Sequence, residues 1–306
     1  MQYLESEKKI GNVIPNITLM LERNALRFSD KNVFSRKINR EYKGISWNIF
    51  YEDIQNIASN LKANGFRKGD KMVIYSPNSL EMLELELAIM ASGGIAVPIF
   101  AYFQGETAEL LIKHSDAKFL AVAGETQLNR ISENLPLKNI IVFDTIKDSS
   151  HKNLIPFGEL LKESTEKKSS LNFDAGENDI CLNMYTSGTM GVPKCVQLSH
   201  RNILSQQAGL EKIWGLNEND RFLSYLPWHH SFGGIFELFS ALYNGAEIFL
   251  ESSYGKEAQE IFENWKKVQP TAFFSVPKVY QSLFELTKSN KEAEELFFHS
   301  GLKFIF

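Results

Sequence analysis

The sequence of 306 residues has only two cysteines, Cys181 and Cys195, which excludes a scaffold held together by disulfides. It also has no surplus of positive charge, because 33 Lys and Arg stand against 37 Asp and Glu for a net charge of −4. A protein that binds nucleic acid mainly through phosphate contacts is therefore not expected. Small molecules are the expected partners.

Long hydrophobic runs are absent as well. The most apolar window, residues 83–100, is interrupted by charged and helix-breaking side chains, so we expect a helix, a turn and a buried strand there rather than a transmembrane segment. Residues 1–16 lack the apolar core of a secretory signal. Together with the scarce cysteines, this predicts a cytoplasmic protein. Peripheral contact with a membrane stays open.

What the sequence does contain is a regular alternation of short apolar runs with helical patterns, which predicts an α/β fold with mostly parallel sheets flanked by helices. In the first half we expect strands over 71–75, 95–99, 119–123 and 140–143, and helices over 80–92, 105–114 and 125–134. In the second half we expect strands over 180–185, 222–226, 246–250 and 271–276, and helices over 199–214, 232–243 and 256–268.

A polar, unpatterned stretch over residues 163–178 is the best candidate linker between two abutting α/β lobes. We place the boundary near Leu171, which gives a first subdomain over 1–170 and a second over 171–306. Upstream, residues 19–61 predict two helices around a short antiparallel strand pair. The buried face of the second helix is expected to hold Ile49, Phe50, Ile54, Ile57, Ala58 and Leu61.

The most informative segment is a loop rich in hydroxyls and glycines that a lysine closes, over residues 185–196. Thr186, Ser187 and Thr189 supply hydroxyls, and a mobile positive charge comes from Lys194. Gly188 and Gly191 allow bare backbone N–H groups to approach an anion. These groups suit a polyphosphate, whereas the alternative is an ordinary polar turn.

The loop differs from the common nucleotide-binding P-loop, in which a Gly-Lys-Ser/Thr sequence leads directly into a helix. Here Pro193 precedes the lysine, Cys195 follows it, and residues 195–198 alternate as a strand does. We therefore expect the loop to join two strands.

This segment resembles the signature loop of the adenylate-forming superfamily, whose usual form is Tyr-Thr-Ser-Gly-Thr-Thr-Gly-x-Pro-Lys-Gly. The chain departs from it at Met190, which replaces a threonine, and at Cys195, which replaces a glycine where the backbone bends freely. We expect altered affinity for phosphate rather than a dead loop. The resemblance implies that ATP is bound by Thr186, Ser187, Gly188, Thr189, Met190, Gly191, Pro193 and Lys194.

A second segment, residues 226–234, follows a predicted strand and carries two adjacent histidines. It resembles the superfamily's Pro-x-His-His-x-Phe-Gly segment, which borders the acid to be activated. The resemblance implies that His230 lies near the carboxylate and the adenylate, and that Trp228 and Phe232 shape an acyl tunnel. His229 and Gly233 would complete this substrate pocket. The alternative is a pair of partly buried histidines that satisfy backbone groups.

The resemblance extends over most of the chain and is strongest to long-chain acyl-CoA synthetases, on the segments 69–73 and 96–98. It implies an amino-terminal portion of a ligase that forms acyl-AMP and then acyl-CoA from ATP, a fatty acid and coenzyme A. Lys194, Thr186 and His230 would act in catalysis. No His/Cys cluster has metal-ligand spacing, and the resemblance implies a magnesium carboxylate beyond Phe306, in a part that also holds the small carboxy-terminal domain.

Other interpretations stay open. The acid could be an amino or aryl acid, and the chain could be a non-catalytic module that binds acyl groups or nucleotide, or a truncated remnant. We expect the chain to be inactive alone. The apolar terminal strand over 304–306 would be an exposed sheet edge, which predicts poor solubility.

Overall fold

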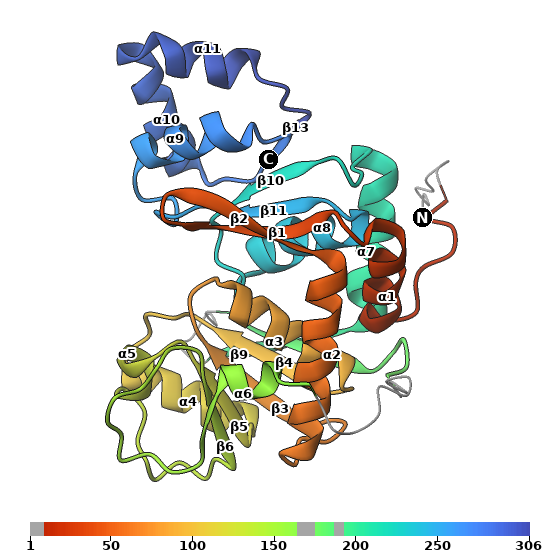
Figure 1. Cartoon of the computed structure of the whole chain (residues 1–306), viewed down its shortest axis with the longest axis vertical. Coiled ribbons are helices and arrows are strands. Elements are labelled where there is room, and N and C mark those ends of the chain that lie inside the picture. Colours follow the sequence, from red (N-terminus) through yellow and green to blue (C-terminus); the bar gives the residue numbers. More distant parts are fainter. Residues whose placement is uncertain (1–8, 164–174, 187–192) are drawn as a thin grey trace, which may run out of the picture.

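Two β-sheets flanked by helices form an upper and a lower lobe (Figure 1). The computed structural model describes residues 9–163, 175–186 and 193–306. The predicted α/β class is confirmed, and residues 164–174 of the predicted linker lie outside the described residues. No helix in the described ranges is both long enough and apolar enough to cross a bilayer.

The lower sheet has the strand order β7-β6-β5-β3-β4-β8-β9. Its neighbours run parallel except β8 and β9, which are antiparallel. The strands are β3 (Lys71–Tyr75), β4 (Ile95–Ile99), β5 (Phe119–Val122), β6 (Asn139–Val142), β7 (Leu154–Pro156), β8 (Ile180–Thr186) and β9 (Lys194–Ser199). Strands β3, β4 and β5 are almost entirely buried, as expected of parallel strands covered on both faces.

The upper sheet has the order β13-β12-β10-β11-β1-β2, and only the β1–β2 pair is antiparallel. Its strands are β1 (Asn32–Ile38), β2 (Glu41–Ser46), β10 (Arg221–Ser224), β11 (Glu247–Leu250), β12 (Ala272–Phe273) and β13 (Phe304–Ile305). The terminal strand β13 lies at the sheet edge, with Ile305 and Phe306 exposed.

The two sheets exchange segments of the chain. β1 comes from the first fifty residues but pairs with β11 of the upper sheet, where Phe34 is opposite Ile248. β8 and β9 follow the predicted linker but join the lower sheet beside β4. The sheets therefore do not divide the chain at residues 170 and 171, since each lobe takes strands from both sides of that boundary.

Helices cover both sheets and fill the space between them (Figure 1). They are α1 (Ile17–Phe28), α2 (Trp47–Ala63), α3 (Leu80–Ala91), α4 (Gly105–Ser115), α5 (Glu125–Leu128), α6 (Phe157–Leu161), α7 (His200–Trp214), the π-helix η1 (Phe232–Leu238), α8 (Phe239–Asn244), α9 (Ala258–Val268), α10 (Pro277–Ser289) and α11 (Lys291–His299). Ser199 caps α7 as expected, in a reciprocal capping box with Asn202.

Most expected elements are present, and the differences concern the bounds or type of single elements. The two helices around an antiparallel pair are confirmed as α1, β1, β2 and α2. The helix expected over 125–134 ends at Leu128, and the one expected over 232–243 begins as η1. Ile49 was wrongly assigned to the buried face of α2, since it is 51% exposed, whereas Phe50 beside it is fully buried.

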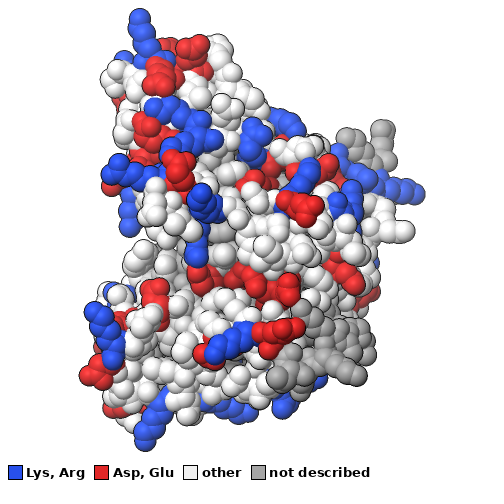
Figure 2. Space-filling model, in the orientation of Figure 1, with Lys and Arg blue, Asp and Glu red and all other residues white. Residues whose placement is uncertain are grey.

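Charged side chains of both signs are interspersed over the face drawn in Figure 2, with acidic side chains gathered along the border between the lobes. This face shows no continuous basic surface of the kind that binds nucleic acid.

Helix α3 is enclosed in the core that the two lobes share. Every residue from Met82 to Ala91 is buried, including Glu84 and Glu86. Burial raises the pKa of Glu86 to about 8 and, with nearby acidic groups, that of Glu84 to about 9. Both side chains are therefore neutral acids at neutral pH, because burial removes the hydration of a carboxylate, and Glu84 Oε1 and Glu86 Oε2 have no hydrogen-bond partner among the described residues.

These acids predict how stability depends on pH. The unfolded chain releases the Glu86 proton near the ordinary pKa of 4.5, but the folded chain holds it until about pH 8. The folded state then binds more protons across this window, so stability falls as the pH rises through it. Glu86→Gln should raise the free energy of unfolding at pH 8 by on the order of a few kcal/mol and flatten the pH dependence.

Urea titrations at about pH 5 and about pH 8 measure this effect. Glu133→Gln is the matched control, since Glu133 is exposed and its loss should leave the pH dependence unchanged. A Glu86→Gln variant with the pH dependence of the parent protein would show that Glu86 is ionised in the folded state.

Candidate functional site

Four parallel strands, two from each sheet, point their carboxyl ends at a common region. The segments that follow β3, β4, β10 and β11 meet there and line one cavity. In open α/β sheets this edge is where ligands bind. Since the strands belong to different sheets, the region is also the junction between the lobes.

Asn78 ties the two lobes together at this junction. Its side chain, 4% exposed, donates to the carbonyl of Leu226 at 2.7 Å and accepts from the backbone N–H of Trp228 at 3.0 Å. The hydroxyl of Tyr254 donates to the carbonyl of Asn78 at 3.4 Å. Asn78, the third residue after β3, thus fixes the backbone on both sides of Pro227, in the loop that leads to the two histidines.

One cavity, here named the loop cavity, lies where the ends of the hydroxyl-rich loop meet these histidines. It has a volume of about 370 Å³, and its walls include Phe100, Tyr185, Thr186, Pro193, His229 and His230. Two motifs that lie more than thirty residues apart in the sequence are therefore brought together in space. The size and the mixture of apolar and polar walls suit a small-molecule site.

The hydroxyl-rich loop joins two strands, as predicted, because β8 and β9 pair antiparallel and Thr186 lies opposite Lys194. We name this strand pair, with the segment that connects it, the ribbon. Ser187, Gly188, Thr189, Met190 and Gly191 lie outside the described residues. Lys194 is exposed at the start of β9. Cys195 pairs with Tyr185 and has no positive φ, so the backbone at this position does not need a glycine.

The two histidines differ in environment. His229 is half-buried, its ring centroid lies 5.2 Å from that of Phe100, and burial beside His230 lowers its pKa to about 4. His229 is therefore neutral at neutral pH. His230 is exposed, and its Nδ1 accepts from the backbone N–H of Phe232 at 3.3 Å. A neutral His230 then carries its proton on Nε2, which can donate to an anion.

Of the other predicted pocket residues, Trp228 lies in the core and Phe232 is half-buried beside it. Trp228 is fully buried, packs edge-to-face on Phe34 and donates from Nε1 to Ser224 Oγ at 3.3 Å. Phe232 packs against the rings of Phe274 and Phe306. Both positions support a role in the core, and their role in an acyl tunnel stays a prediction.

Gly233 is required by the loop geometry itself. A Cβ there would lie 2.6 Å from the carbonyl oxygen of Pro227 and 2.8 Å from that of Leu226. No substituent fits at these distances, so Gly233 lets η1 start directly behind the histidine loop.

Sequence reasoning missed the lobe junction. Asn78, Phe100, Tyr102, Tyr254 and Lys256 were not singled out, although each lies in a segment that follows a predicted strand. Their position at the carboxyl ends of strands could have identified them. What the sequence could not show is that the two sheets turn these edges toward each other.

The described residues fit one of the implied cofactors better than the other. Thr186 and Lys194 face each other across the strand pair, and no ion pair neutralises Lys194 within the described ranges, so the ribbon ends suit a polyphosphate. No cluster of three His, Cys, Asp or Glu side chains with metal-binding geometry is found in those ranges. That these ribbon ends bind phosphate is therefore a hypothesis that their chemistry supports.

Two mixed sheets, with the antiparallel pair β8 and β9 at one edge and Lys194 at the start of β9, match the amino-terminal domain of the adenylate-forming class. The chain belongs to the AMP-binding enzyme family, whose model matches residues 21–306. It is 25% identical over 275 residues to the long-chain-fatty-acid–CoA ligase ACSBG2 of Homo sapiens. That match includes 86% of this chain and 41% of the human protein, so the chain spans less than half of that relative's length.

Solved structures share the fold. A long-chain-fatty-acid-CoA ligase (FadD1) from Archaeoglobus fulgidus superimposes with a TM-score of 0.76 at 21% identity, over 94% of this chain and 57% of that one. The anthranilate CoA ligase AuaEII, in complex with anthranoyl-AMP, gives a TM-score of 0.73 at 21% identity, over 90% of this chain and 52% of that one.

The junction at Asn78 generates a stability prediction. Asn78→Ala leaves the Leu226 carbonyl and the Trp228 N–H buried without partners, which should lower the free energy of unfolding by about 2–4 kcal/mol. Chemical denaturation of the purified chain measures it. Asn134→Ala, at an exposed asparagine, should change stability by less than about 0.5 kcal/mol. Equal effects of the two substitutions would contradict the role given to Asn78.

Proposed function

We propose that the chain is the portion of a larger enzyme that binds ATP and activates a carboxylic acid as acyl-AMP, which then transfers its acyl group to coenzyme A. The observation that carries the proposal is the meeting of the ribbon ends with His230 at one cavity. Family membership supports the reaction class, and the partial match to longer relatives makes the complete activity a proposal.

The ribbon's part in this reaction is to hold and neutralise phosphate. A carboxylate that attacks the α-phosphorus of ATP approaches a polyanion, so the site must supply positive charge and N–H dipoles. In this proposal the ammonium of Lys194 and the hydroxyl of Thr186 supply charge and a dipole at the base of the ribbon, where the two residues lie opposite each other on β9 and β8. Ser187, Gly188, Thr189, Met190, Gly191 and Pro193 would complete the phosphate contacts.

His230 orients the acid in the proposed reaction. Its Nδ1 is engaged by the backbone of Phe232, so Nε2–H is the group left to donate to a carboxylate or an adenylate oxygen. His229 would serve as an apolar wall, since its ring is neutral and lies against Phe100. The two histidines thus have different roles despite being adjacent.

Magnesium would supply charge neutralisation at the phosphates, and coenzyme A would be the second substrate. The carboxylate ligand of the magnesium ion is proposed to lie in a segment beyond Phe306. A cytoplasmic location, with or without peripheral membrane contact, stays a prediction.

The acid is proposed to be a long-chain fatty acid, because relatives such as the human ligase are named for that substrate. An aryl acid is the second candidate, because the anthranilate ligase shares the fold with a similar TM-score. A long flexible acyl chain and a short aromatic ring need pockets of different shape. An assay that compares one acid of each kind therefore distinguishes the two candidate substrates.

The test is exchange of labelled pyrophosphate into ATP by the full-length protein, with palmitate and with benzoate as acids. Palmitate should support exchange, and Lys194→Ala should lower its rate by about 100-fold or more, since a charge that acts on the phosphates in the transition state is lost. Lys212→Gln, at an exposed lysine on α7, is the matched control and should retain the rate.

Exchange with benzoate but not with palmitate would show that the substrate is an aryl acid and not a fatty acid. Absence of exchange with every acid, while ATP still binds, would favour a non-catalytic nucleotide-binding module. Unchanged exchange in Lys194→Ala would contradict the role of the ribbon.

A further inference from the structure

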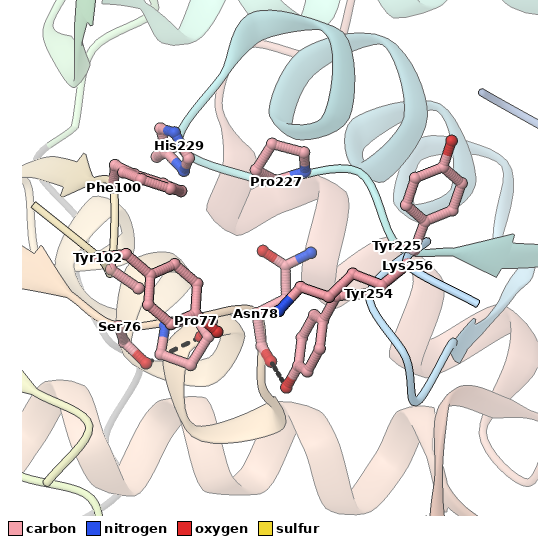
Figure 3. A pocket seen from close by; sticks show the side chains of 11 residues that line it. Ser76, Pro77, Asn78, Phe100, Tyr102, Tyr225, Pro227, His229, Tyr254 and Lys256 are labelled. Atoms are coloured by element: carbon pink, nitrogen blue, oxygen red, sulfur yellow. Dashed lines mark hydrogen bonds between the residues drawn. The ribbon is translucent and has the colours of Figure 1, made fainter. Parts of the chain in front are cut away.

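A second cavity, here named the tyrosine cavity, adjoins the histidine loop, and Figure 3 shows the side chains that line it. It has a volume of about 330 Å³, and its walls include Phe100, Tyr102, Tyr225, His229, Tyr254 and Lys256. Phe100 and His229 also line the loop cavity. Their two rings therefore form the partition between the cavities.

The walls combine flat apolar faces with a single cationic side chain. Phe100, Tyr102, Tyr225 and Tyr254 supply aromatic rings from three of the four converging segments. Lys256 extends across the cavity, between Pro227 above and Tyr254 below in the view of Figure 3. Within the described ranges it makes no ion pair, and its Nζ lies 5.5 Å from the centroid of the Tyr102 ring. Its charge is thus available to an anion.

The loop that presents Tyr254 and Lys256 is held in an unusual backbone conformation. Tyr254 and Gly255 have consecutive positive φ angles of 53° and 74°. The carboxylate of Glu251 stabilises this turn by accepting from the N–H groups of Ser253 and Gly255, both at 2.8 Å. Gly255 admits no side chain, because a Cβ would lie 2.3 Å from the ring of Tyr225. Strain of this kind persists where the surrounding structure enforces it, and it concentrates at ligand sites.

We propose that the tyrosine cavity binds a planar organic anion, with its carboxylate at the ammonium of Lys256 and its ring against Tyr102 and Tyr254. The cavity is large enough for a compound of two fused rings and is bounded by the strand ends where ligands bind in this class of fold. This site is distinct from the phosphate ribbon. Its occupant would touch the proposed reaction site only through the rings of Phe100 and His229.

The test is calorimetric titration of the full-length protein, without ATP, using 2-naphthoate and its neutral methyl ester. We expect saturable binding of one naphthoate and weaker binding of the ester. Lys256→Gln should weaken naphthoate binding about three- to fivefold, as expected for a solvent-exposed ion pair. Tyr102→Leu, at a half-exposed ring, should weaken it by a similar factor, and the double variant by more than about tenfold.

Two variants serve as controls. Lys212→Gln removes an exposed lysine outside the cavity and should bind naphthoate as the parent protein does. Lys194→Ala should also retain naphthoate binding. A failure of the proposed ATP-dependent reaction would therefore leave this proposal standing, and a failure to bind naphthoate would leave the proposed reaction standing. Equal affinity for acid and ester, unchanged binding in the double variant, or loss of binding in Lys194→Ala would each overturn it.

NMR of the His229 ring, which separates the two cavities together with Phe100, is a second measurement of the same binding. Bound naphthoate should shift the NMR signals of the His229 ring, because the ring lines the cavity. The shift should be absent in the double variant at the same concentration. A His229 signal that is unaffected at saturation would place the ligand elsewhere.

Discussion

The hydrogen bonds of one buried carboxamide hold the junction on which both cavities depend. Asn78 follows the first strand of the lower sheet and bonds the backbone on both sides of Pro227, in the loop after β10 of the upper sheet. The histidines begin two residues further on, so their position relative to the lower lobe is set by this contact. The apolar core between the sheets brings the lobes together, but it does not by itself align two loops, because apolar packing has little directional preference.

The exchange of strands gives the junction its rigidity. β1, from the amino-terminal part of the sequence, joins the upper sheet, whose other strands except β2 come from after residue 220. β8 and β9, which follow the predicted linker in the sequence, join the lower sheet, whose other strands all precede that linker. Helix α3 lies between them with all residues from Met82 to Ala91 buried. The lobes therefore cannot separate without breaking a shared core, and the carboxyl edges of the two sheets remain face to face.

Local elements of the fold could be predicted because their causes are local. The period of the apolar residues identified most helices and strands, and the alternation after Lys194 correctly placed the hydroxyl-rich loop between two strands. The partners of the strands could not be predicted in this way. Nothing near β1 in the sequence indicates that Phe34 lies opposite Ile248, since pairing over more than two hundred residues is decided by the packing of the whole chain.

In the candidate site, too, some residues could be predicted from local sequence and others only from the arrangement of the sheets. The ribbon and the two histidines stand out in the sequence because both are short, ordered motifs of chemically active side chains. Asn78 and Lys256 have no motif around them, and only the arrangement of the sheets gives them a role. The buried Trp228 shows the reverse case, where a residue inside a motif lies in the core beside Ser224 and Phe34.

The central claim is that the junction of the two sheets holds the phosphates of ATP on the ribbon between β8 and β9. A crystal structure of the full-length protein with a non-hydrolysable ATP analogue tests this most directly. We expect phosphate oxygens within hydrogen-bond distance of Thr186 Oγ1 and Lys194 Nζ, with the α-phosphate facing His230. Nucleotide bound at another surface, with the ribbon making no contact to it, would contradict the claim.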